Sequence, residues 1–363
     1  MELETKTPQN QADPYREEPF AKSTRYLAEM NSLTAFHASH CSAYSRILHA
    51  AYGGKTTFDS LPALPALPVR LFKEIDLLSV PHDQVLKTLS SSGTSGQRPS
   101  RIFLDKETAT SQAHALVRIV RSFVGNRRLP MMILDHPGVL KDRSAFSARG
   151  AGILGFSQFG ADVTYALQTP SLLPDWLAID SFLERHRCER ILMFGFTFIL
   201  WQHLLLAAEQ ANRKLDFGDS ILIHGGGWKK LEESKVSNEE FKGRLRSTLG
   251  IRAIHNYYGM VEQTGSIFME CEQGCFHAAD YSEILTRDPR TLAVQPHGAP
   301  GLIQTMSTIP RSYPGHILLT EDLGIVHGAD GCTCGRRGTH FSILGRLASA
   351  ELRGCSDTHQ VPA

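Results

Sequence analysis

The sequence predicts a layered α/β fold that becomes richer in β structure after about residue 300. Three observations lead to this prediction. Short apolar runs alternate with longer stretches of helical periodicity, and glycine or proline follows several of the runs. Beyond residue 300 the apolar runs follow one another directly. Alternating strands and helices are typical of largely parallel sheets that helices cover.

The N-terminal region is predicted to be a polar, mobile tail over residues 1–20 and then helical. Between residues 20 and 60, apolar side chains recur at helical spacing, at Leu33, Phe36, Tyr44, Ile47, Leu48 and Tyr52. The prolines between Leu61 and Val69 end this pattern, because proline lacks the backbone N–H that a helix needs. An extended segment is expected there.

Strands and helices are then expected to alternate. Three apolar runs predict strands, at Met131–Leu134, Ile191–Phe194 and Ile221–Ile223. Helical periodicity predicts helices at Glu107–Phe123, Leu172–His186 and Asn238–Leu249. The β-rich part is predicted to hold strands at His316–Thr320, Asp322–Val326 and His340–Leu344. Together these elements predict one compact unit over residues 21–345, followed by a flexible tail over residues 346–363.

Composition limits the classes of function. The hydrophobic fraction of 42% is enough for a folded core. With 38 Lys and Arg against 37 Asp and Glu, the net charge of +1 argues against nucleic acid or an anionic membrane as a partner. No run approaches the roughly 20 apolar residues of a membrane span. The polar N-terminus has no apolar signal core, so a cytoplasmic protein is expected.

A run rich in hydroxyl groups and glycine is the strongest candidate for a phosphate-binding loop. It consists of Ser91, Ser92, Gly93, Thr94, Ser95, Gly96 and Gln97. Glycine lets the backbone approach an anion, while hydroxyl and N–H groups donate to phosphate oxygens. The run lacks the Gly-Lys-Ser/Thr ending of a Walker A loop. Taken alone, it is equally compatible with a flexible loop.

Four further motifs follow the loop in a fixed order. They are His224-Gly225-Gly226-Gly227-Trp228-Lys229-Lys230, Asn256-Tyr257-Tyr258-Gly259-Met260-Val261-Glu262-Gln263-Thr264-Gly265, Leu319-Thr320-Glu321-Asp322-Leu323-Gly324 and Gly345-Arg346. In this order the set resembles the adenylate-forming (ANL) superfamily. A closer resemblance is to the acyl-protein synthetase (LuxE) family, over about residues 60–356. It is carried also by Pro68–Lys73, Ser147–Arg149, Phe194–Phe198 and Leu352-Arg353-Gly354-Cys355.

The resemblance implies an adenylation core that lacks the usual C-terminal lid domain, with ATP and Mg²⁺ as cofactors. By this likeness Ser91–Gln97, with Thr94 at its centre, would hold the ATP phosphates. Gly225–Gly227 and Trp228 would line the adenine side, and Tyr258, followed by Gly259, would stack on the base. Glu262 would hold Mg²⁺, Asp322 the ribose hydroxyls, and Arg346 ribose or phosphate. The side chains of these residues suit the implied roles, because carboxylates bind hard cations and guanidinium groups bind phosphate.

The motifs also have simpler explanations. Tyr258 could be a core aromatic residue, Asp322 a turn residue and Glu262 a surface carboxylate. Val261 departs from the superfamily, which usually has Thr just before the motif glutamate. A nucleotide-binding partner subunit without catalysis therefore remains an alternative function.

Cys355 is the candidate acyl acceptor. A thiolate attacks a mixed anhydride readily, and Arg353 and His359 are placed to favour that thiolate. The resemblance implies a fatty acid that is activated as acyl-AMP and passed to Cys355. From there the acyl group would go to a partner, a reductase or a carrier. The alternative acceptor is free coenzyme A or a carrier-protein thiol. The sequence does not indicate the oligomeric state or which acid is used.

The remaining cysteines suggest a structural zinc site. Cys41 and Cys188 are isolated and are predicted to be buried apolar residues. Two clusters supply five candidate ligands, Cys271, Cys275, His277, Cys332 and Cys334. A resemblance of this stretch to phenylacetate–CoA ligases implies Cys271, His277, Cys332 and Cys334, with Cys275 as an alternative to His277. The simpler alternative is reduced thiols packed in loops.

Overall fold

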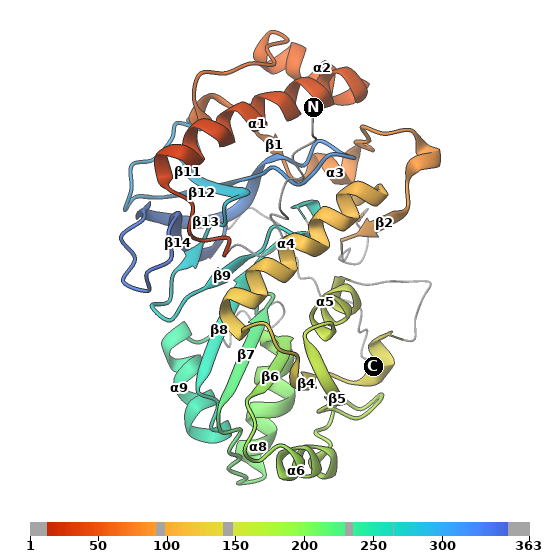
Figure 1. Cartoon of the computed structure of the whole chain (residues 1–363), viewed down its shortest axis with the longest axis vertical. Helices are drawn as coiled ribbons and strands as arrows, with labels where there is room; N and C mark the ends of the chain where they lie inside the picture. Colours follow the sequence, from red (N-terminus) through yellow and green to blue (C-terminus); the bar gives the residue numbers. More distant parts are fainter. Residues whose placement is uncertain (1–12, 92–98, 141–147, 229–234, 264, 348–363) are drawn as a thin grey trace, which may run out of the picture.

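A single mixed sheet runs through the whole molecule. The computed structural model describes residues 13–91, 99–140, 148–228, 235–263 and 265–347. Within them a 12-stranded sheet has the order β11-β12-β13-β14-β10-β9-β8-β7-β6-β4-β5, and β1 (Leu67–Pro68) pairs with β13. Figure 1 shows the sheet with its antiparallel half above and its parallel half below. The predicted α/β layering with a β-rich C-terminal part is confirmed.

The parallel half contains the predicted central strands. Its strands are β4 (Leu129–Leu134), β5 (Gly160–Tyr165), β6 (Ile191–Phe196), β7 (Ser220–Gly225) and β8 (Ala253–Tyr258). Every residue of β6 and β7 is buried, as expected for parallel strands with both faces covered.

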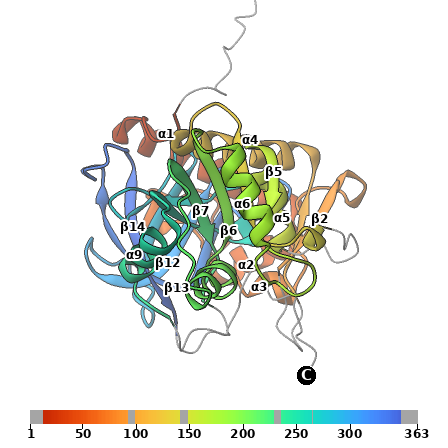
Figure 2. The ribbon, with the colours of Figure 1, turned by 90° about the horizontal axis from the view of Figure 1, so that it is seen from below.

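Helices cover both faces of these strands. On one face lie α4 (Lys106–Val124) and α5 (Ala148–Ser157), which pack on side chains such as Ile133 and Phe194. On the other face lie α6 (Trp176–Arg185), α8 (Leu206–Gln210) and α9 (Asn238–Leu249), which pack on side chains such as Met193 and Leu222. Figure 2 shows α4 and α9 on opposite sides of β6 and β7. This arrangement leaves the carboxyl ends of the strands open for a site.

The antiparallel half consists of β9 (Phe268–Glu270), β10 (Phe276–His277), β11 (Ser282–Arg287), β12 (Pro300–Ser307), β13 (Ile317–Ala329) and β14 (Thr339–Arg346). Two N-terminal helices, α1 (Pro19–His40) and α2 (Ser42–Tyr52), lie over it in Figure 1. Helix α1 contributes Tyr26, Met30 and Leu33 to a core cluster with Met306 and Ile317. A short helix, α3 (Leu71–Glu74), follows β1, and a separate hairpin pairs β2 (Lys87–Ser90) with β3 (Arg101–Leu104).

Several predicted boundaries were wrong. The helix expected over 172–186 begins only at Trp176, because Pro174 precedes it and the Asp175 carboxylate caps it by accepting from Ala178 N–H. The strands expected at 316–320 and 322–326 are one strand, β13, because both β12 and β14 pair along it. The helical pattern expected over 20–60 forms two helices, which Cys41 separates and which end at Tyr52.

Two tails and one cysteine also differ from the prediction. Within residues 13–18 of the predicted N-terminal tail, Pro14 and Tyr15 are buried, and α1 begins at Pro19. Arg346, the expected start of the C-terminal tail, is the last residue of β14. Cys188 is exposed, not buried, because it follows α6 in the turn before β6, whereas Cys41 is buried as predicted.

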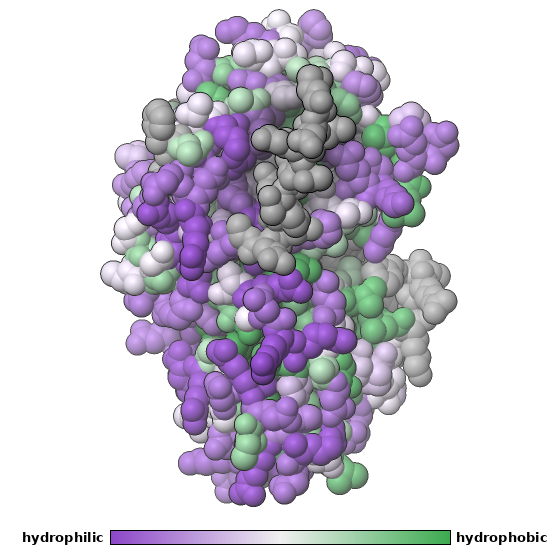
Figure 3. Space-filling model, viewed as in Figure 1, coloured by the Kyte–Doolittle hydropathy of each residue, from purple (hydrophilic) through white to green (hydrophobic). Residues whose placement is uncertain are grey.

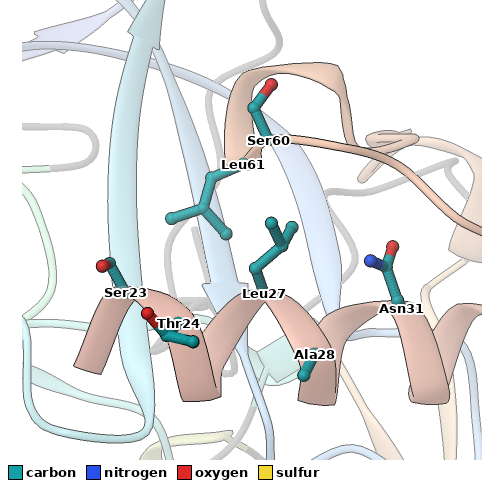
Figure 4. Close-up of a pocket in the computed structure, with 7 residues that line it drawn as sticks. All are labelled: Ser23, Thr24, Leu27, Ala28, Asn31, Ser60 and Leu61. Carbon is teal, nitrogen blue, oxygen red and sulfur yellow. The ribbon is translucent and has the colours of Figure 1, made fainter. Parts of the chain in front are cut away.

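The face shown in Figure 3 is mainly polar. Hydrophilic side chains predominate on the face in Figure 3, and its hydrophobic areas are small and separate. No helix of the described residues is long and apolar enough to cross a membrane. A surface pocket of about 500 Å³ lies between α1 and the turn at Ser60 and Leu61 (Figure 4). None of the predicted site residues lines this pocket.

Buried histidines make stability depend on pH. His37 of α1 accepts from the Ser79 hydroxyl at 2.8 Å and donates to the Pro310 carbonyl at 3.2 Å. Burial lowers the pKa of His37 and of His224 to about 3, and that of His316 well below its usual range. In the unfolded chain these rings take up a proton near pH 6.5, whereas in the folded chain they stay neutral to far lower pH.

We therefore expect the free energy of unfolding to fall as pH drops from about 6.5 toward 5, before carboxylates titrate. Each buried ring contributes a slope of up to about 1.4 kcal/mol per pH unit. Urea unfolding at several pH values would measure the slope for the wild type and for His37→Gln. The slope of the variant should be smaller by the contribution of one histidine ring, up to about 1.4 kcal/mol per pH unit. Equal slopes would contradict this account.

Candidate functional site

Three of the predicted residues meet where the two halves of the sheet join. Tyr258, at the end of β8, donates its hydroxyl proton to Asp322 Oδ2 of β13 at 2.7 Å. Arg346 of β14 lies opposite Asp322 in the sheet register, and its Nε is 3.4 Å from Asp322 Oδ1. Tyr258 and Asp322, which are 64 positions apart in the sequence, thus belong to one cluster with Arg346. Each carboxylate oxygen of Asp322 still has a lone pair that can accept a hydrogen bond from a further donor.

Burial and charge keep the Tyr258 phenol protonated. Its ring packs against Phe268 at 6.1 Å and against Phe341 at 6.4 Å between centroids. Burial, together with the negative charge of Asp322, raises the pKa of Tyr258 well above its usual value. The phenol therefore remains a hydrogen-bond donor at any ordinary pH, and it fixes the orientation of the carboxylate.

The glycine turn lies one strand away from Tyr258. Gly225 ends β7 opposite Tyr257, whose ring would be only 2.3 Å from a Cβ at that position. Gly226 follows with φ +73°, a left-handed conformation that favours glycine. A Cβ on Gly227 would meet no atom within 4 Å. The turn thus offers bare backbone at the carboxyl end of a parallel strand, where ligands bind in such sheets.

The side chain of Trp228, which was predicted to line the adenine side, packs in the core. Its side chain is buried, with ring centroids 5.0 Å from Trp201 and 5.8 Å from Phe241. It therefore anchors the glycine turn to the core beneath it.

Glu262 lies in a short 3₁₀ turn, Val261–Gln263, and is buried. Its carboxylate has no ion-pair partner among the described residues, which leaves it available to a cation. Neighbouring Met260 and Val261 pack on the core cluster that contains Leu89 of β2 and Ile102 of β3. Gly259 adjoins this turn and lies against Ile267. The packing brings the glutamate turn to the hairpin that flanks the predicted phosphate loop.

The base of that loop is closed by paired serines. Ser91 N–H donates to the Ser100 carbonyl at 3.1 Å, and Ser100 N–H donates to Ser91 Oγ at 2.9 Å. Residues Ser92–Gln97, including Thr94, lie outside the described residues, as does Cys355.

Four of the five predicted metal ligands converge. The ligand atoms of Cys271, His277, Cys332 and Cys334 all lie within 4.8 Å of one another. Cys271 Sγ is 3.8 Å from Cys332 Sγ, and Cys334 Sγ is 3.4 Å from His277 Nε2. Zinc–ligand lengths of about 2.0–2.3 Å predict ligand separations of roughly 3.5–3.8 Å in a tetrahedron. The structure thus favours the set with His277 over the one with Cys275.

The protonation chemistry of this cluster suits a metal. Burial raises the pKa of Cys271 to about 12 and lowers that of His277 to about 4. A neutral imidazole is the form that binds metal, whereas the Cys271 thiol, with so high a pKa, needs a nearby cation to become a thiolate. A closed set of sulfur and nitrogen ligands is typical of structural zinc.

The N-terminal segment lies against the cluster. Arg337 N–H donates to the Tyr15 carbonyl at 3.0 Å, and Asp280 N–H donates to the Pro14 carbonyl at 2.8 Å. The Tyr15 ring is edge-on to His277, with centroids 6.1 Å apart. Residues 13–18, hereafter the N-terminal strap, thus contact both ligand-bearing loops.

Sequence reasoning missed a buried ion pair at the same edge of the sheet. Asp135, directly after β4, accepts two hydrogen bonds from Arg149 at the start of α5, and both side chains are fully buried. The backbone N–H of His136 adds a third at 2.7 Å. An aspartate after an apolar run and the arginine of Ser147-Ala148-Arg149 were the available signals, but nothing in the sequence pairs them.

We expect Tyr258→Phe to destabilise the protein by about 1.5–3 kcal/mol, since the hydrogen bond it removes goes to a charged group. Urea unfolding would measure this loss. Tyr313→Phe is the matched control, because the Tyr313 hydroxyl is buried and has no hydrogen-bond partner among the described residues. Equal stability changes in the two variants would show that the Tyr258–Asp322 bond contributes nothing.

Known proteins resemble the chain along most of its length. It matches the protein family described as "Acyl-protein synthetase, LuxE" over residues 12–361. It is 25% identical over 317 residues to the long-chain-fatty-acid–luciferin-component ligase of Vibrio harveyi. This alignment covers 82% of this chain and 78% of that protein. A ligase of the same description from Aliivibrio fischeri is 29% identical over 135 residues, 36% of this chain and 34% of that protein.

A solved structure shares the fold. 2-Hydroxyisobutyryl-CoA ligase, in an open conformation with 2-HIB-AMP and CoA, aligns with a TM-score of 0.73 at 16% identity. The alignment covers 96% of this chain and 76% of that one. This likeness confirms the predicted adenylate-forming fold. Because the family match spans nearly the whole sequence, the chain belongs to the acyl-protein synthetase (LuxE) family and is an acid–thiol ligase that activates acyl groups with ATP.

Proposed function

We propose that this enzyme activates a fatty acid as acyl-AMP and then carries the acyl group as a thioester on Cys355. In the first step an acid carboxylate oxygen attacks the α-phosphorus of ATP. The bond from that phosphorus to the bridging oxygen breaks, and pyrophosphate leaves with the electron pair. In the second step the Cys355 thiolate attacks the acyl carbon, and AMP leaves. The acyl group then passes to a partner, a reductase or a carrier.

The observation that carries the proposal is the Tyr258–Asp322–Arg346 cluster beside the glycine turn. Asp322 would accept the ribose hydroxyls, with Tyr258 and Arg346 holding its carboxylate in place. The bare backbone of Gly225–Gly227 would face the adenine. Ser91–Gln97 would donate to the phosphates, with Thr94 nearest the reacting phosphorus.

Glu262 fits a Mg²⁺ ligand, because its buried carboxylate has no ion-pair partner among the described residues. Mg²⁺ bound there would neutralise charge on the phosphate oxygens. Val261 supplies no hydroxyl next to this glutamate, so the donors to the α-phosphate would come from Thr264 or the phosphate loop.

The fatty nature of the acid is supported by the relatives. Both relatives are described as long-chain-fatty-acid–luciferin-component ligases. In this chain, aromatic side chains gather where α5 meets β6 and β8. Phe156 stacks on Phe194 with centroids 4.1 Å apart, and Tyr257 lies 5.4 Å from Phe156. These rings would form an apolar wall on the acyl side.

We expect Cys355→Ser to keep acid-dependent exchange of pyrophosphate into ATP and to lose covalent acylation, because the hydroxyl is a far weaker nucleophile than a thiolate. Intact-mass spectrometry after incubation with ATP, Mg²⁺ and fatty acids would measure the adduct. Cys188→Ser, which removes an exposed cysteine, is the control and should keep the adduct. Acylation that survives in Cys355→Ser would remove the terminal thiol from the pathway. Rapid acyl-CoA formation in that variant would favour coenzyme A as acceptor.

We also infer that Cys271, His277, Cys332 and Cys334 hold a structural zinc ion. Its loss should free the N-terminal strap, because the strap hydrogen-bonds to Arg337 and Asp280 beside the ligands. Treatment with a strong chelator should release about one zinc per chain, lower the melting temperature and let trypsin cut after Arg16.

Metal analysis and peptide mapping would measure these effects, and Cys332→Ser should reproduce them without chelator. Cys188→Ser should bind zinc as the wild type does. A purified protein without zinc and with an intact strap would overturn the inference.

A further inference from the structure

A buried threonine connects two strand ends beside the glycine turn. Thr197 follows β6 directly and begins a short helix, α7 (Thr197–Ile199). Its Oγ1 lies 3.2 Å from the carbonyl oxygen of Gly225 and 3.0 Å from Nδ1 of His224. Thr197 and His224 are 5% and 1% exposed, so both hydrogen bonds are shielded from water.

The direction of these hydrogen bonds follows from the number of protons. A carbonyl oxygen only accepts, so the single Thr197 hydroxyl proton goes to Gly225. His224 Nδ1 must then carry a proton and donate it to Thr197 Oγ1. Burial holds the ring neutral and lowers the pKa of His224 to about 3, so Nε2 is a bare acceptor without a partner among the described residues. The result is a directional chain from His224 through Thr197 to Gly225.

This chain fixes the first peptide of the glycine turn. The Gly225 carbonyl belongs to the peptide that leads into Gly226, where φ is +73°. Glycine has no side chain that could hold this peptide plane, and its backbone is the most permissive. Tyr257 closes one side of Gly225, where a Cβ would lie 2.3 Å from its ring. Thr197 supplies the hydrogen bond that sets the orientation of the peptide plane.

We propose that Thr197 is a positioning residue for the nucleotide base. This proposal rests on the proposed function, which places adenine against Gly225–Gly227. A base that packs on a peptide plane can hydrogen-bond to its N–H and C=O groups, so a plane held in one orientation discriminates between bases such as adenine and guanine better than a mobile one. A turn that can reorient would bind both bases more weakly, with a smaller difference between the two affinities.

Thr197→Val tests the proposal, because it keeps the shape of the side chain and removes the hydroxyl. The KM for ATP in pyrophosphate exchange should rise about tenfold, as the loss of one hydrogen bond implies, while kcat changes by less than about twofold. The preference for ATP over GTP in kcat/KM should fall by a similar factor. Thr197→Ser, which restores the hydroxyl, should return both values to those of the wild type.

The chain contains a matched control for simple loss of stability. Thr34 of α1 has the same kind of bonds, since its hydroxyl donates to the Met30 carbonyl at 2.8 Å and accepts from His316 Nε2 at 3.0 Å. It is fully buried, as is His316, and lies in the helix that covers the antiparallel half. Thr34→Val should lower the melting temperature as Thr197→Val does, yet leave the KM for ATP and the base preference unchanged.

Two outcomes would overturn the proposal. One is a Thr197→Val enzyme with the KM and base preference of the wild type. The other is a Thr34→Val enzyme that shows the same changes. The Kd of a fluorescent ATP analogue, measured without the carboxylic acid substrate, tests the role of Thr197 in nucleotide binding independently of the proposed reaction. A wild type that binds the analogue but exchanges no pyrophosphate would refute the proposed reaction, and the Kd of Thr197→Val would still decide the role of Thr197.

Discussion

The hydrogen bond from Tyr258 to Asp322 joins the two halves of this molecule at its candidate site. Tyr258 ends the last strand of the parallel half, and Asp322 lies within the longest strand of the antiparallel half. A half-buried phenol donates here to a carboxylate, and such charge-assisted bonds are stronger and more directional than neutral ones. The orientation of Asp322, and hence any ribose site it forms, depends on how β8 and β13 are held together.

The rest of the structure holds those strands in place. β9, β10 and β14 lie between β8 and β13 in the sheet, so the spacing of the two halves is set by backbone pairing. The Cys271–His277–Cys332–Cys334 cluster ties the β9–β10 turn to the β13–β14 turn on the same strands. A zinc ion bound to these four side chains, as proposed above, would limit how β14, which carries Arg346, can shift against β9 and β10. In that role it would support the site at a distance from the chemistry.

Much of this arrangement could be predicted from sequence, where local patterns decide the outcome. The apolar runs of β4, β6 and β7 and the periodicity of α4 and α9 gave those elements within a few residues. The ordered motifs indicated the family, and the cysteine clusters indicated the four side chains that converge. The resemblance assigned Gly225–Gly227 and Tyr258 to the same adenine side, and in the structure they lie at the ends of two paired strands, β7 and β8.

Other features depend on contacts with distant parts of the chain, which local sequence patterns do not predict. Trp228 lies beside three glycines in sequence, yet its large ring is drawn into the core by Trp201 and Phe241. Tyr15 looked like part of a polar tail, and its burial depends on backbone groups more than 250 residues away, such as those of Asp280 and Arg337. The pairing of Asp135, after β4, with Arg149 of α5 and that of Thr197, after β6, with His224 of β7 likewise arise only when separate elements pack together.

The most direct test of this account is a crystal structure with a non-hydrolysable acyl-AMP analogue, a fatty acyl sulfamoyl adenosine. The account predicts the adenine between Gly226 and Tyr258, and the ribose hydroxyls within hydrogen-bond distance of Asp322. An analogue bound elsewhere, with Asp322 still held only by Tyr258 and Arg346, would contradict it.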